Sequence, residues 1–82
     1  MASIRHKNLR LVIYPNDHGP PHAHIIGPDF EVKANLIGRV RLDPKQLTAL
    51  SVKAKRECLL AIRDHRLQLI RIWSNLHGSS QD

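Results

Sequence analysis

The chain has 82 residues and a formal net charge of +6 at pH 7, with its six histidines counted as neutral. This length fits one domain, so we expect residues 1–82 to form a single small domain with frayed ends at residues 1–3 and 78–82. The single cysteine excludes an intramolecular disulfide, and no apolar run has the length of a membrane span. We therefore expect a cytoplasmic protein with no membrane partner, whose basic surface favours acidic partners.

Short apolar and β-branched segments predict strands in the first half of the chain. The first is expected over residues 9–14 and the second over residues 22–26, on either side of a break rich in proline and glycine. A third strand, over residues 30–36, follows a turn and has apolar side chains at alternate positions. Residues 39–42 alternate as well and predict a short fourth strand.

The second half of the chain predicts helix. Asp43 suits the N-cap, Pro44 the first helical position, and Gln46 the capping-box position three residues after the cap. Apolar residues then recur at three- and four-residue steps over residues 47–76. A break near residue 51 would leave a short first helix and a long one over residues 52–77, about 39 Å in length.

Strands followed by helix predict an α+β fold, a small antiparallel sheet of three to four strands with the long C-terminal helix packed on one face. The long helix is large for so small a domain, which leaves room for packing on a second copy in a homo-oligomer. The opposite face of the sheet would carry four cations as a platform for nucleic acid or a partner protein, namely Arg10, Lys33, Arg39 and Arg41.

The chemistry-bearing feature is the loop that contains Asp17, His18, His22 and His24. His22 and His24 are two residues apart, so on a strand both imidazoles lie on the same face. The bend formed by residues 19–21 can bring His18 back over that strand.

Two chemistries use such an arrangement. One is a metal site with His18, His22 and His24 as ligands for a divalent transition metal such as zinc, and Asp17 orienting an imidazole. The other is metal-free acid–base catalysis by the same residues. The loop can equally be a turn capped by Asp17 with exposed histidines, so the residues leave enzymatic activity undecided.

Four residues outside the loop matter for its interpretation. His65 lies on the apolar side of the helix, where we expect a histidine bonded to backbone, the alternative being that it completes the loop cluster. Trp73 is expected to anchor the core, and His77, like His6, to be a surface residue near an end.

The stretch Asn-Asp-His-Gly-Pro-Pro-His-Ala-His at residues 16–24 resembles the signature of domain-of-unknown-function family 4160, a family of small bacterial proteins. The segment over residues 65–73, His-Arg-Leu-Gln-Leu-Ile-Arg-Ile-Trp, is similar to the helix of that family. The resemblance implies a protein of a toxin–antitoxin-like two-gene module, with a small cognate protein partner and nucleic acid as a second partner. It implies no established activity.

Three functions follow as hypotheses. The first is a component of a toxin–antitoxin-like module that binds a small partner protein and nucleic acid. The second is a metal- or histidine-dependent nuclease that uses His18, His22 and His24. The third is a metal-binding module without catalysis.

Overall fold

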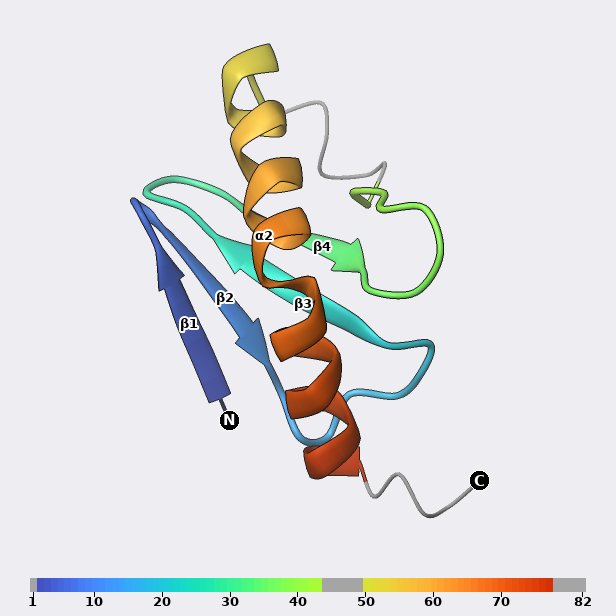
Figure 1. Cartoon of the computed structure of the whole chain (residues 1–82). Coiled ribbons are helices and arrows are strands. Elements are labelled where there is room, and N and C mark those ends of the chain that lie inside the picture. The colour runs from blue at the N-terminus through green and yellow to red at the C-terminus, as the bar shows by residue number, and fades with distance from the viewer. Residues whose placement is uncertain (1, 44–49, 78–82) are drawn as a thin grey trace.

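The computed structural model describes residues 2–43 and 50–77. Four strands, β1 (Ala2–His6), β2 (Leu9–Ile13), β3 (His22–Ile26) and β4 (Glu31–Asn35), precede the helix α2 (Val52–His77). The strands form one sheet in the order β1-β2-β3-β4 with every neighbouring pair antiparallel, and α2 lies across one face of it (Figure 1). The predicted α+β fold, an antiparallel sheet followed by a long C-terminal helix, is confirmed.

The first strand, β1, differs from the sequence-based expectation that residues 2 and 3 are frayed. Ile4 and His6 are half-buried on the side that faces the helix, while Ser3 and Arg5 are exposed. The strand is held by five residue pairs with β2 across a turn of two residues. A single large aliphatic residue gives β1 little hydrophobic signal, and its stability comes from pairing and from the helix above it.

The fourth predicted strand, over residues 39–42, is wrong. Only an isolated bridge between Ala34 and Leu42 forms there. The side-chain amide of Asn35 donates to the carbonyl oxygens of Ile37 at 2.9 Å and Arg39 at 2.6 Å, and this folds residues 36–41 into a loop. Two backbone hydrogen bonds flank the bridge, from Asn35 N–H to the carbonyl oxygen of Arg41 and from Asp43 N–H to that of Lys33, and the loop that Asn35 holds keeps the pairing from extending into a strand. The predicted first helical turn after Asp43 falls on residues 44–49, outside the described residues.

The core lies between the sheet and α2. A row of apolar residues crosses the four strands in register, and the helix contributes residues at steps of three, four and seven. The row consists of Ile4, Leu11, Ile25 and Val32, and the helix residues are Cys58, Ala61, Ile62, Leu69 and Trp73. Trp73 anchors the core as predicted, with 8% of its surface exposed.

The opposite face of the sheet, which we call the open face, carries polar residues. The register places three polar residues of this face, Ser3, His24 and Lys33, in one row with Val12, an apolar residue that is buried. Glu31 lies two residues from Lys33 and therefore on the same face, diagonal to His24. Within the described ranges, no helix is both long and apolar enough to cross a membrane.

Candidate metal centre

Asp17, His22 and His24 come together where the loop between β2 and β3 returns to the sheet. Asp17 belongs to that loop, and the two histidines lie two residues apart on β3, hence on one face. The Oδ2 atom of Asp17 lies 2.9 Å from Nε2 of His24 and 3.2 Å from Nε2 of His22. All three ligand atoms lie within 4.8 Å of one another. We call these three residues the histidine–aspartate cluster.

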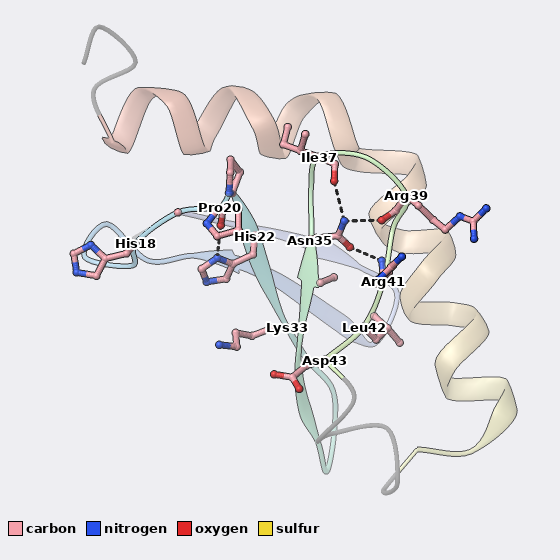
Figure 2. A pocket seen from close by; sticks show the side chains of 13 residues that line it. His18, Pro20, His22, Lys33, Asn35, Ile37, Arg39, Arg41, Leu42 and Asp43 are labelled. Carbon is pink, nitrogen blue, oxygen red and sulfur yellow. Dashed lines mark hydrogen bonds between the residues drawn. The ribbon is translucent and has the colours of Figure 1, made fainter. Parts of the chain in front are cut away.

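The second nitrogen of each imidazole is also engaged. His22 donates from Nδ1 to the carbonyl oxygen of Pro20 at 3.0 Å, and this carbonyl can only accept (Figure 2). Nδ1 of His24 lies 3.3 Å from Oε2 of Glu31, and the carboxylate also accepts. Both Nδ1 atoms therefore carry hydrogen. Nε2 of His24 also faces an acceptor, because it forms a hydrogen bond of 2.9 Å with Asp17, and a metal ion at the cluster would take up the Nε2 lone pairs in place of hydrogen.

The carboxyl group of Asp17 is held in its charged form. Burial raises its pKa, but the hydrogen bond from His24, with the positive charges of His24 and His22, outweighs burial and brings the pKa below the ordinary value. Its side chain is 26% exposed, against 18% for His22 and 16% for His24. An ionised oxygen thus faces two imidazoles in a partly buried site.

Aromatic side chains and the end of α2 hold the cluster in place. The ring of Tyr14 meets His24 edge-on at 4.7 Å, and the ring of Trp73 lies 5.2 Å from that of His22. His77 stacks on Trp73 at 3.8 Å, and its Nε2 lies 2.8 Å from the backbone carbonyl oxygen of Asp17. The last helical turn therefore fixes the backbone of the loop at the residue that supplies the carboxylate.

A cleft of about 690 Å³ opens beside His22 (Figure 2). We call it the cationic cleft because three positively charged residues line it, Lys33 from β4 and Arg39 and Arg41 from the following loop. The side chain of Arg39 points away from His22 and Lys33 (Figure 2). The remaining lining residues are His18, Gly19, Pro20, Pro21, His22, Ala34, Asn35, Ile37, Leu42 and Asp43. A smaller hollow of about 290 Å³ borders His24.

The structure brings some of the predicted site residues together and separates others. His22 and His24 lie side by side as predicted. Asp17 is expected from the sequence to orient an imidazole from the side away from the metal, but its carboxylate faces the Nε2 atoms of both histidines, where it can be a ligand itself. His18 is exposed on the rim of the cationic cleft and, within the described ranges, has no hydrogen bond or ion pair. Arg10 lies on the open face opposite Ile26, and it is not one of the residues that line the cleft.

Sequence reasoning missed four contributors, namely Tyr14, Glu31, Trp73 and His77. Glu31 could have been found, because a hairpin closed at residues 27–30 pairs His24 with Lys33 and puts Glu31 diagonally across from it. His65 does not complete the cluster, since its Nε2 lies 3.1 Å from Nδ1 of His6. His6 and His77 are both half-buried rather than surface residues.

Comparison with protein-family models, with curated proteins and with solved structures finds no match to this chain. The resemblance to family 4160 therefore depends on the residues of the two motifs alone.

Proposed function

We propose that this protein binds a divalent transition-metal ion, zinc by preference, through Nε2 of His22, Nε2 of His24 and the carboxylate of Asp17. One observation carries the proposal: both Nδ1 hydrogens are committed to acceptors, while both Nε2 atoms converge on one carboxylate oxygen. Two imidazoles and a carboxylate form a donor set that zinc and iron accept.

The spacing of the donor atoms fits such an ion. Ligand atoms on a tetrahedral zinc ion, with bonds of about 2.0–2.1 Å, stand about 3.3 Å apart. Asp17 Oδ2 lies 3.2 Å and 2.9 Å from the two nitrogens, within a few tenths of an ångström of that spacing, and the two nitrogens lie within 4.8 Å of each other. The two Nδ1 donors to Pro20 and Glu31 are the kind of outer contacts that orient metal-binding histidines.

The alternative is a metal-free cluster in which protons take the place of the ion. Each imidazole would then carry hydrogen on both nitrogens and one positive charge. Two cations beside one carboxylate give a cluster that gains from exchanging its protons for a divalent ion. The proposal predicts that the protein takes up one zinc ion and releases protons, whereas the alternative predicts that it takes up none.

The test is calorimetric titration of tag-free protein with ZnCl₂, with cobalt(II) absorption as a report on the ligands. We expect one ion per chain, release of protons on binding and loss of binding in the variant His22→Ala/His24→Ala. His18→Ala removes an exposed histidine of the same loop and is the matched control, which should bind as the parent does.

Three results would contradict the proposal. They are a parent protein that takes up no zinc, a double variant that is folded by circular dichroism and still binds, and a His18→Ala variant that loses binding. The last result would mean that the ligand set is a different one.

A second candidate function is the binding of a small partner protein, which the resemblance to family 4160 implies, and the net charge of +6 favours an acidic one. The observation that favours it lies on α2, where Leu67 is 78% exposed and Leu60 38% exposed. Arg63 and Arg71 are exposed on the same helical face. Coexpression with the product of an adjacent gene should give a salt-sensitive complex that Leu67→Glu disrupts, and a complex indifferent to both would refute this surface.

A further inference from the structure

We propose that the cationic cleft binds the phosphate group of a phosphate ester, held by Lys33 and Arg41 next to His22. Binding by these cations needs no metal. The inference rests on the proposed function in one respect only: a metal ion bound at the histidine–aspartate cluster would add a contact to an oxygen of the phosphate.

The charge of the cleft is the first argument. Lys33, Arg39 and Arg41 are exposed, and none of the three has an ion pair within the described residues. The lining contains one acidic residue, Asp43, and this residue has an interaction of its own. The lining thus has an excess of positive charge, which favours an anion in the hollow.

The rigidity of the loop is the second argument. Asn35 donates to the carbonyl oxygens of Ile37 and Arg39 and accepts from the backbone N–H of Arg41, as the dashed lines of Figure 2 show. From α2, Arg66 donates to the carbonyl oxygens of residues 36 and 38 at 2.7 Å and 2.8 Å. Arg39 and Arg41 therefore project from a backbone held at both ends, and less ordering is needed when a ligand binds.

The third argument concerns which anion fits. A phosphate presents several strong acceptor oxygens, and the forked guanidinium of an arginine binds two of them at once. Arg41 and Lys33 together offer more donors than a lone carboxylate can use. His18, exposed on the rim, offers a further ring nitrogen.

The fourth argument concerns the rest of the ligand. The volume of about 690 Å³ is within the usual range for small-molecule sites. Apolar surface from Pro20, Pro21, Ile37 and Leu42 can cover an organic group attached to the phosphate. The lining contains no phenylalanine, tyrosine or tryptophan among the described residues, so a nucleobase would find no stacking platform there. Recognition would then be of the phosphate and independent of base sequence.

The experiment measures the binding of three probes by calorimetry, namely inorganic phosphate, adenosine monophosphate and a single-stranded oligonucleotide. Each is titrated with and without ZnCl₂. The cleft variant is Lys33→Gln/Arg41→Gln. The matched control is Arg5→Gln/Arg10→Gln, which removes the same charge from exposed positions that pair with each other in register.

We expect at least one probe to bind to the metal-free parent, with affinity about tenfold lower in the cleft variant and nearly unchanged in the control. Adenosine monophosphate bound more tightly than phosphate would identify an organic ester, and binding confined to the oligonucleotide would identify a nucleic-acid backbone. A stronger dependence on the control arginines than on the cleft, or no binding of any probe, would overturn the inference.

The two proposals fail separately. If Asp17→Asn/His24→Ala, which changes two cluster residues outside the cleft lining, abolishes zinc binding and the enhancement of phosphate binding by zinc but leaves metal-free phosphate binding, both proposals stand. If the parent takes up no zinc yet the cleft variant loses the phosphate probe, the metal centre is refuted and the cleft is retained.

Discussion

The turn that joins β3 to β4 offers a prediction whose size follows from the geometry. The backbone N–H of Gly27 donates to the carbonyl oxygen of Phe30 at 2.9 Å, and the ring of Phe30 lies over the glycine. A Cβ added at Gly27 would stand 2.4 Å and 2.5 Å from the Cζ and Cε2 atoms of that ring. Carbon atoms pack at about 3.5–4.0 Å, so Gly27→Ala must displace the ring by about 1 Å or more.

The expected cost is about 1–3 kcal/mol, the usual penalty for overpacking, because Phe30 is partly buried against the core and cannot move freely. In a domain of this size each kcal/mol lowers the melting temperature by about 4–8 °C. The assay is urea and thermal unfolding followed by the fluorescence of Trp73, the sole tryptophan.

The decisive comparison is a double-mutant cycle with Phe30→Leu, which removes the ring atoms that the new Cβ would meet. Gly27→Ala should then cost almost nothing, because the conflict is gone. Gly19→Ala is the control, since no atom lies within 4 Å of a Cβ placed there. Equal costs of Gly27→Ala in both backgrounds would refute the reasoning, and so would a parent background that tolerates the change.

Three further predictions concern single side chains. Burial raises the pKa of Cys58 to about 11, so the native thiol should resist a disulfide reagent at pH 8 and react only on unfolding; rapid native reaction would contradict this. Arg66→Met should cost about 1–3 kcal/mol in urea unfolding because two loop carbonyls lose their donor, whereas the exposed Arg63→Met should cost almost nothing. The pKa of Asp17 is lowered by His24 and His22 against the opposing effect of burial, so its stabilising contribution is present above the ordinary carboxyl pKa of about 3.9 and is lost as pH falls through the lower folded-state value. Asp17→Asn should therefore flatten the acid side of the stability curve of metal-free protein, and an unchanged curve would speak against the contact.

The parts of the fold that the sequence predicted are those in which apolar residues recur at a regular spacing. The helix over residues 52–77 and the strands near residues 9–13 and 22–26 repeat apolar residues at the spacing of their own secondary structure. Strand β1 has a single large aliphatic residue, so its sequence lacks that signal, and its stability comes from pairing with β2. Residues 39–42 carry the signal but do not form a strand, since the side chain of Asn35 binds the loop backbone at three points.

The candidate site shows the same division between local and distant causes. The period of two along a strand is enough to predict that His22 and His24 share one face, and both lie on β3. The position of Asp17 depends on the path of the loop, and the contact of its carbonyl with His77 joins residues sixty positions apart. Spacing in sequence cannot report such a contact, because only the packing of α2 on the sheet creates it.

The metal centre and the cationic cleft are best understood together through their charges. A divalent cation adds to a protein that already has a net charge of +6, and the local compensation comes from Asp17, supported by Glu31 behind His24. A phosphate in the adjoining cleft would offset the added charge. An ion held by three protein ligands would also have a position open for an oxygen of that phosphate. Each ligand should therefore raise the affinity for the other. Because binding free energies are reciprocal, the factor by which zinc strengthens phosphate binding must equal the factor by which phosphate strengthens zinc binding. A measured pair of unequal factors would mean that the two sites are not at equilibrium, and a factor of one would mean that His22 does not connect them.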